Sequence, residues 1–193
     1  MVIRLMKYVR YLSLICLVGI SNLIIGQNQN LYTSEIFVKN NDTLQYRMLL
    51  PKDFSESKQY PLVLFFHGAG ERGNDNVTQL VHGSSLFSNE KNRDSFPAII
   101  VFPQCPKEDY WSNVKRDYSK KGLEKFKYKR RGRPTKSMKL VLGLMDDLTN
   151  KPYVKKNQVY VGGLSMGGMG TFEILKRRPN MFAAAFPISG GGN

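Results

Sequence analysis

The chain has 193 residues and a formal net charge of +14, from 29 Lys and Arg against 15 Asp and Glu. Hydrophobic residues make up 41% and charged residues 23%. This composition is that of a folded globular domain and excludes an intrinsically disordered chain. The length suits one domain with a core of its own. The only two cysteines, Cys16 and Cys105, exclude a disulfide framework and a multi-cysteine zinc site.

Residues 1–26 have the pattern of a signal peptide. Three basic residues precede an apolar run over 11–20, and small Gly26 lies where a signal peptidase cleaves. Ser21 and Asn22 interrupt the apolar residues, so the run is too short for a stable membrane span. We therefore expect a cleaved signal peptide and a mature protein that is secreted or periplasmic. An uncleaved anchor is the alternative.

Strand patterns recur along the rest of the chain. Residues 35–39 alternate, 40–42 are turn formers, and 43–50 resume the alternation, which predicts an antiparallel hairpin. Four nearly continuous apolar runs follow, over 60–66, 96–102, 158–161 and 182–188. Such runs are typical of strands buried on both faces in a mostly parallel sheet.

Helices are predicted between these strands. Apolar residues at three- and four-residue spacing predict an amphipathic helix over 135–149. A second helix is expected over 168–177, ending before Pro179, and a shorter one within 75–88. Strands that alternate with helices indicate an α/β fold with helices on both faces of the sheet.

Residues 107–139 hold most of the positive charge, with 13 Lys and Arg against 4 Asp and Glu. Aromatic residues alternate with the basic ones in the densest part, over 125–133. Such patches can bind nucleic acid or acidic polysaccharide. No nucleic-acid partner is expected for an exported protein, so we interpret the segment as an exposed surface loop. A binding surface for anionic glycans is the alternative.

The sequence Gly163-Leu164-Ser165-Met166-Gly167 fits the nucleophile-elbow pattern G-x-S-x-G. A predicted strand precedes it and a predicted helix follows, as that turn requires. The serine of such an elbow sits in a strained conformation that exposes its hydroxyl, and the glycines leave room for strand and helix. The Met166 N–H, at the helix N-terminus, would stabilise an oxyanion. The alternative is a glycine-rich turn with an incidental serine.

A glycine-rich loop, His67-Gly68-Ala69-Gly70-Glu71-Arg72-Gly73, follows the predicted strand 60–66. This is where a second oxyanion donor is expected, and we assign it to the Ala69 N–H. Gly68 and Gly70 give the backbone freedom to turn. We expect a structural role for His67, because the catalytic base follows the nucleophile along chains that carry this elbow motif.

Three stretches of this chain resemble the α/β-hydrolase superfamily: residues 67–76, Phe102 to Pro106 together with Trp111, and residues 163–168. The closer resemblance, over about residues 31–193, is to secreted bacterial esterases of the predicted peptidase, phospholipase/carboxylesterase and dienelactone-hydrolase-like kinds. It implies an α/β-hydrolase fold, an acyl-enzyme on Ser165, and an oxyanion hole formed by Met166 and Ala69. It also implies that five residues line the pocket: His67, Gly68, Gly70, Gln104 and Trp111. For Trp111, packing in the core is the other role considered.

The other members of a catalytic triad are missing from the expected positions. An acid and then a histidine should follow the serine, but only Glu173 and no histidine follow Ser165. We expect Glu173 at the surface of the helix and His82 in a loop or helix end beside the pocket. The hypothesis is that residues 27–193 form the N-terminal part of a single α/β-hydrolase domain whose last strands are missing.

The function expected from these residues is a carboxylic-ester hydrolase as the complete protein, with this fragment alone inactive. Its substrates would be small-molecule or polysaccharide esters, and no metal or other cofactor is expected. A strained elbow costs about 1–3 kcal/mol, which favours a catalytic purpose. The alternatives are a degenerate hydrolase without turnover and a basic glycan-binding module.

Overall fold

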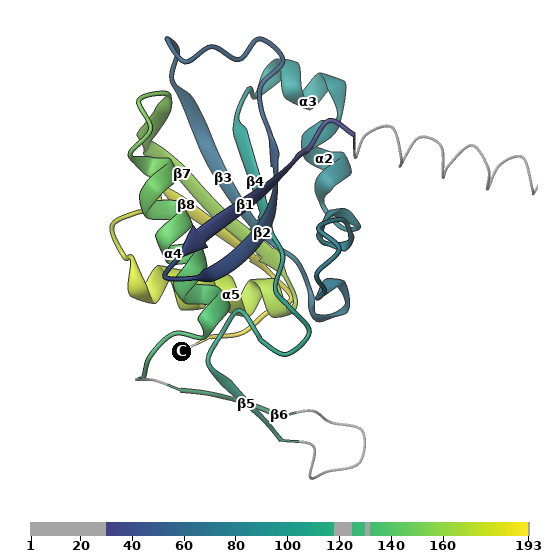
Figure 1. Cartoon of the computed structure of the whole chain (residues 1–193), viewed down its shortest axis with the longest axis vertical. Coiled ribbons are helices and arrows are strands. Elements are labelled where there is room, and N and C mark those ends of the chain that lie inside the picture. Colours follow the sequence, from purple (N-terminus) through teal and green to yellow (C-terminus); the bar gives the residue numbers. More distant parts are fainter. Residues whose placement is uncertain (1–29, 118–124, 130–131, 193) are drawn as a thin grey trace, which may run out of the picture.

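A computed structural model describes residues 30–117, 125–129 and 132–192. Its centre is a six-stranded sheet in the order β1-β2-β4-β3-β7-β8 (Figure 1). The strands are β1 (Thr33–Lys39), β2 (Asp42–Leu49), β3 (Tyr60–Phe66), β4 (Ile99–Pro103), β7 (Val154–Leu164) and β8 (Ala184–Ile188). Strands β4, β3, β7 and β8 run parallel, and the β1–β2 hairpin joins them antiparallel through β2. The predicted mostly parallel α/β architecture is confirmed.

Helices cover both faces of this sheet. Figure 1 shows α4 (Lys136–Thr149) and α5 (Met166–Arg177) on one side and α2 (Ser84–Ser88) and α3 (Glu90–Ser95) on the other. A large core cluster lies under α4 and α5, and a smaller one, built around Phe65 and Phe102, lies on the opposite face. The Thr135 hydroxyl accepts the Met138 N–H at 3.2 Å, which caps α4 where the sequence places its start.

The predicted hairpin is confirmed, and its turn is tighter than expected. Asn40 and Asn41 have φ of 51° and 63°, the left-handed conformation of a two-residue turn, so that Asp42 already belongs to β2. Within the predicted short helix over 75–88, the structure has a 3-10 turn η2 (Thr78–Leu80) and α2. A further 3-10 turn, η1 (Ala69–Glu71), follows β3.

Three expectations need correction. Strand β4 begins at Ile99 rather than 96, because Pro97 has no N–H for the ladder. Strand β8 is not buried on both faces: Phe186 and Ile188 are 37% and 44% exposed, since β8 lies at the edge of the described sheet. The basic segment is not only a loop, since it contains an antiparallel hairpin, β5 (Val114–Asp117) and β6 (Lys125–Tyr128).

The hairpin forms because residues 125–128 alternate basic and aromatic side chains with the two-residue period of a strand. The remaining basic residues, over 118–124 and 130–131, lie outside the described residues, as does the signal peptide expected over 1–26. None of the helices in the described part of the chain is long and apolar enough to cross a membrane.

Candidate active site

Ser165 forms the turn between β7 and α5. Its backbone has φ 55° and ψ −110°, a left-handed conformation that is uncommon for a residue with a side chain. Ser165 is exposed, whereas Met166 and Gly167 beside it are buried. The Ser165 N–H donates to the Ile188 carbonyl at 2.8 Å, which fastens the turn to β8. The strand, the strained serine and the helix occur as the elbow motif predicts.

The two glycines of the motif allow β3, β7 and α5 to meet at Phe66. A Cβ on Gly163 would lie 2.7 Å from the Phe66 carbonyl oxygen, and one on Gly167 would lie 2.1 Å from it. No side chain fits at such distances, because nonbonded carbon atoms pack at about 3.5–4.0 Å. Glycine is therefore required at both positions for the helix to begin directly above the sheet.

The loop that follows β3 lies beside the Ser165 turn. Phe66 pairs with Gly163, so the loop and the turn leave neighbouring parallel strands at the same edge. A Cβ on Gly68 would be 3.6 Å from the Leu164 carbonyl oxygen, which is ordinary van der Waals contact. Ala69 begins η1 in this loop, and Met166 begins α5. The two expected oxyanion donors thus belong to neighbouring backbone segments at the same edge of the sheet.

His67 is bonded through both ring nitrogens. Its Nε2 accepts the Cys105 N–H at 3.0 Å, so the ring proton lies on Nδ1, which donates to the Gly68 carbonyl at 2.6 Å. Burial lowers the pKa of His67 to about 4, so the ring is neutral at ordinary pH. The side chain is 1% exposed. It therefore has no free nitrogen with which to act as a base.

The hydrogen bond from His67 Nδ1 to the Gly68 carbonyl also orients a candidate oxyanion donor. The Gly68 carbonyl and the Ala69 N–H belong to one peptide unit, and a planar trans peptide points them in opposite directions. By holding the carbonyl, His67 sets the direction of the Ala69 N–H. The structural role expected for His67 thus has a specific geometry.

Trp111 and His67, two of the expected pocket residues, are both buried, with their ring centroids 5.2 Å apart. Trp111 is fully buried, with its ring 4.9 Å from that of Phe66, and its Nε1–H donates to the His67 carbonyl at 3.2 Å. Both side chains pack beneath the elbow. Of the two loop glycines, Gly68 is buried and Gly70 is exposed.

Gln104 borders a cavity of about 600 Å³ at the same edge of the sheet. The cavity lies between the β1–β2 turn, the end of β4 and the start of α4, and polar side chains such as Asn74, Glu108 and Lys136 line it. Gln104 is nevertheless only 3% exposed, and its amide group is hydrogen-bonded to the loop over 71–78. Most of its polar capacity is therefore used within the protein.

The expectation for Glu173 was wrong. Its carboxylate is 6% exposed and accepts Arg177 Nε–H at 2.8 Å, one helical turn further along α5. It is buried because the segment that returns from the β5–β6 hairpin covers this side of the helix. His82, in the loop between η2 and α2, is exposed, with its Nε2 3.5 Å from Glu71 Oε1.

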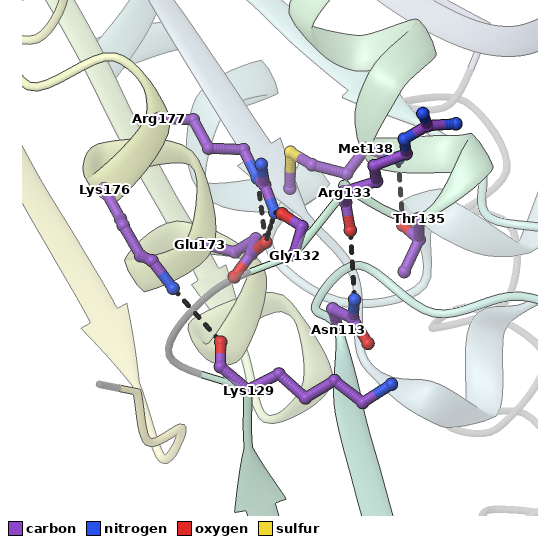
Figure 2. A network of polar contacts seen from close by, with 9 residues as sticks. All are labelled: Asn113, Lys129, Gly132, Arg133, Thr135, Met138, Glu173, Lys176 and Arg177. Atoms are coloured by element: carbon purple, nitrogen blue, oxygen red, sulfur yellow. Dashed lines mark hydrogen bonds and ion pairs between the residues drawn. The ribbon is translucent and has the colours of Figure 1, made fainter.

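The segment that follows the β5–β6 hairpin, with Lys129, Gly132 and Arg133, is called the hairpin segment here. Figure 2 shows how it is bound to α5. Lys176 Nζ donates to the Lys129 carbonyl at 3.1 Å, and Arg177 Nη2 donates to the Gly132 carbonyl at 3.2 Å. On the other side of this segment, Asn113 Nδ2 donates to the Arg133 carbonyl at 3.0 Å. The side chains of Lys176 and Arg177 are therefore both bound to backbone oxygens of this chain. Within the described ranges, no group of three or more His, Cys, Asp and Glu could hold a metal ion.

Known proteins resemble this chain both in sequence and in structure. A sequence model of the phospholipase/carboxylesterase family matches residues 54–191. A thermostable esterase is similar in structure, with a TM-score of 0.72 and 31% identity over 86% of this chain and 43% of its own. No curated protein was found to match the chain in sequence.

Two more distant structures share the fold. One is FphF, a fluorophosphonate-binding serine hydrolase of Staphylococcus aureus, at 18% identity and a TM-score of 0.56, over 82% of this chain and 56% of its own. The other is a ferulic acid esterase at 21% identity and a TM-score of 0.57, over 82% of this chain and 60% of its own. The chain thus spans between 43% and 60% of the length of these three proteins.

Proposed function

Since the chain belongs to the phospholipase/carboxylesterase family of α/β-hydrolases, we propose that the complete protein is a carboxylic-ester hydrolase with Ser165 as its nucleophile. The observation that carries this proposal is the backbone of Ser165, at φ 55° and ψ −110° on an exposed turn. Strain of this kind costs about 1–3 kcal/mol and persists where the surrounding structure imposes it. Here Gly163, Gly167 and the bond to Ile188 impose it.

The reaction would pass through an acyl-enzyme. Ser165 Oγ attacks the ester carbonyl carbon while its proton passes to a base, and the carbonyl oxygen becomes an oxyanion. The N–H groups of Met166 and Ala69 would donate hydrogen bonds to that oxyanion. The tetrahedral intermediate then expels the alcohol, which takes up the proton. Water releases the acid from Ser165 in a second, equivalent step.

The base and the orienting acid are proposed to come from a part of the complete protein outside these residues. No histidine follows Ser165, and the two that precede it are engaged elsewhere. His67 is neutral and bonded at both nitrogens, and His82 faces Glu71. That the thermostable esterase is more than twice as long as the matched region supports this proposal. The chain over 1–193 alone should then be inactive.

The substrate class proposed is that of small-molecule or polysaccharide esters, met in a secreted or periplasmic compartment. The structurally similar ferulic acid esterase makes a feruloyl ester a reasonable member of the test panel. No metal or other cofactor is required by the proposed steps, since the charge is stabilised by backbone N–H groups.

The test is hydrolysis of p-nitrophenyl acetate, p-nitrophenyl butyrate and methyl ferulate by the complete protein. Ser165→Ala should lower kcat by at least about 10³-fold, as loss of a nucleophile does. Ser85→Ala, which removes another exposed serine, should leave kcat unchanged. A fluorophosphonate probe should add its mass to the peptide that contains Ser165. Full activity of Ser165→Ala would rule out the proposed mechanism.

A further inference from the structure

We propose that Asp75 and Gln104 are positioning residues that hold the loop carrying the Ala69 N–H in its oxyanion-binding conformation. The inference rests on the proposed function, because it concerns the geometry of that site. It assigns a purpose to a nearly closed network of polar contacts that the nucleophile elbow does not require.

Gln104 anchors the network to the sheet. Its backbone N–H donates to the Gln45 carbonyl at 2.8 Å, at the end of β4. Its side-chain Nε2 donates to Asp75 Oδ1 at 2.7 Å and to Thr78 Oγ1 at 2.9 Å. Its Oε1 accepts the Asn76 N–H at 2.7 Å. A nearly buried amide thus has both its donor and acceptor sides bonded to one loop.

Asp75 closes the loop on itself. Its Oδ1 also accepts the backbone N–H groups of Val77 and Thr78 at 2.9 and 3.0 Å. Burial would raise the pKa of Asp75, but hydrogen bonds from the Thr78 and Val77 backbone and from nearby side chains outweigh it and lower the pKa to about 2. The carboxylate is therefore ionised wherever an esterase would be assayed, so these bonds are charge-assisted.

Thr78 connects this network to the candidate oxyanion hole. Its hydroxyl lies 3.0 Å from Asp75 Oδ1 and 3.2 Å from the carbonyl oxygen of Glu71. Glu71 is the last residue of η1, the turn that begins at Ala69. Two residues further on, the Gly73 N–H donates to the Cys105 carbonyl at 3.0 Å.

The Ala69 turn is therefore held from two sides. His67 binds the Gly68 carbonyl before the turn, and the Asp75–Gln104 network binds the Glu71 carbonyl after it. Arg72 adds a bond from Nε to the Ala69 carbonyl at 3.0 Å. Oxyanion donors are effective only when they are held in place before the charge develops. Loss of the network should thus weaken binding of the transition state more than binding of the substrate.

The experiment compares Asp75→Ala, Asp75→Asn and Asp146→Ala in the complete protein, with p-nitrophenyl acetate as substrate. Asp75→Ala should lower kcat by about 10- to 100-fold and change KM by less than about 2-fold, because transition-state contacts are lost. Asp75→Asn keeps the Oδ1 acceptor and should recover most of kcat. Asp146→Ala removes a half-buried carboxylate that binds Arg178 far from this loop, and should leave kcat unchanged.

Amide hydrogen exchange gives a second measurement that does not depend on activity. Exchange of the amides over 68–72 should be faster in Asp75→Ala than in the wild type, and unaltered in Asp146→Ala. If Asp75→Ala does not fold, Thr78→Val removes the hydroxyl that bonds to the Glu71 carbonyl and leaves only the longer bond from Gln104 Nε2, at 3.5 Å, so a smaller fall in kcat in the same direction is expected.

The outcomes separate the two proposals. A wild-type protein that hydrolyses no ester overturns the proposed function, whatever the exchange data show. A wild-type esterase whose folded Asp75→Ala variant keeps its kcat, or loses activity only through KM, overturns the positioning role. Slower turnover in Asp75→Ala without rescue by Asp75→Asn also contradicts it.

Discussion

The carbonyl oxygen of Phe66 lies 2.1 Å from the position that a Cβ on Gly167 would occupy. This close approach joins the last residue of β3 to the first turn of α5, beside the turn that contains Ser165. The carbonyl carbon of Phe66 would lie only 2.6 Å from the same Cβ. The three nearest atoms all belong to the backbone of Phe66 and His67, so no flexible side chain could move away. The distance between helix and sheet is therefore set by the absence of a side chain at this position.

Gly167→Ala is therefore expected to be more damaging than an ordinary glycine-to-alanine change in a helix, which is stabilising. The helix would have to shift, with a loss of about 2–4 kcal/mol in the free energy of unfolding, at the upper end for single substitutions. Urea denaturation would measure this loss. The control is Gly70→Ala, where nothing lies within 4 Å of the new Cβ. Equal stability of the two variants would contradict the close packing described here.

Ser165→Gly is expected to stabilise the protein while it abolishes hydrolysis. Glycine adopts positive φ without a steric penalty, so the strain at φ 55° would be relieved. We expect a gain of about 1 kcal/mol in the free energy of unfolding, after the greater entropy of glycine in the unfolded chain is subtracted. Ser165→Ala keeps the Cβ and should show no such gain. A Ser165→Gly variant less stable than Ser165→Ala would indicate an unstrained turn, because only the entropy cost of glycine would then remain.

The parts of the site that could be predicted from sequence are those encoded by neighbouring residues. The elbow needs a strand, two glycines around Ser165 and a helix, and all of them lie within about twenty residues. The strained φ and the tight contacts of Gly163 and Gly167 follow from that local pattern. The parallel centre of the sheet was equally predictable, because its strands are apolar runs bounded by turn residues.

The parts that could not be predicted depend on contacts between distant segments. Glu173 looked like a surface residue because helix periodicity does not show that the segment at Gly132 returns over it. The bond between Gln104 and Asp75 could not be predicted, because only the fold brings the end of β4 against the loop that contains Asp75. The strand over 125–128 was not predicted because a run of positive charge is typical of an exposed loop, although its basic and aromatic residues alternate with the period of a strand.

The stability of the protein should fall in weakly acidic solution because of His67. Burial lowers the pKa of this ring from 6.5 to about 4, so between these values the unfolded state binds a proton that the folded state does not. The contribution of His67 to the free energy of unfolding is thus present in full above about pH 6.5. It declines as the pH falls toward 4, by up to about 1.4 kcal/mol per pH unit. Urea denaturation at pH 7 and pH 4.5 would measure it.

The matched variant for that measurement is His67→Asn, whose side-chain amide can donate to the Gly68 carbonyl but does not titrate. The variant should lose less stability than the wild type between pH 7 and pH 4.5. A wild type and variant that lose the same amount would show that His67 does not account for the acid sensitivity.

Arg177 is expected to contribute more to stability than Arg178, the next residue in the chain. Arg177 and Glu173 are 18% and 6% exposed, whereas Arg178 and its partner Asp146 are 39% and 41% exposed. Removing one member of a buried pair leaves an uncompensated charge, at a cost of about 3–5 kcal/mol, while exposed pairs contribute about 0–1 kcal/mol. Because Arg177 still has some contact with water, we expect Arg177→Met to cost about 2–3 kcal/mol and Arg178→Met less than about 1 kcal/mol.

Loss of Arg177 should also loosen the hairpin segment, because its Nη2 binds the Gly132 carbonyl. Limited trypsin digestion should therefore cut the basic segment over 107–139 faster in Arg177→Met than in Arg178→Met. The two variants are matched, because each removes one arginine, and so one trypsin site, at the C-terminal end of α5. Double substitution of Glu173 and Arg177 by Gln and Met should recover part of the lost stability, since no buried charge then remains unpaired. Equal unfolding free energies and equal cleavage rates for the two single variants would show that the buried pair does not fasten this segment to α5.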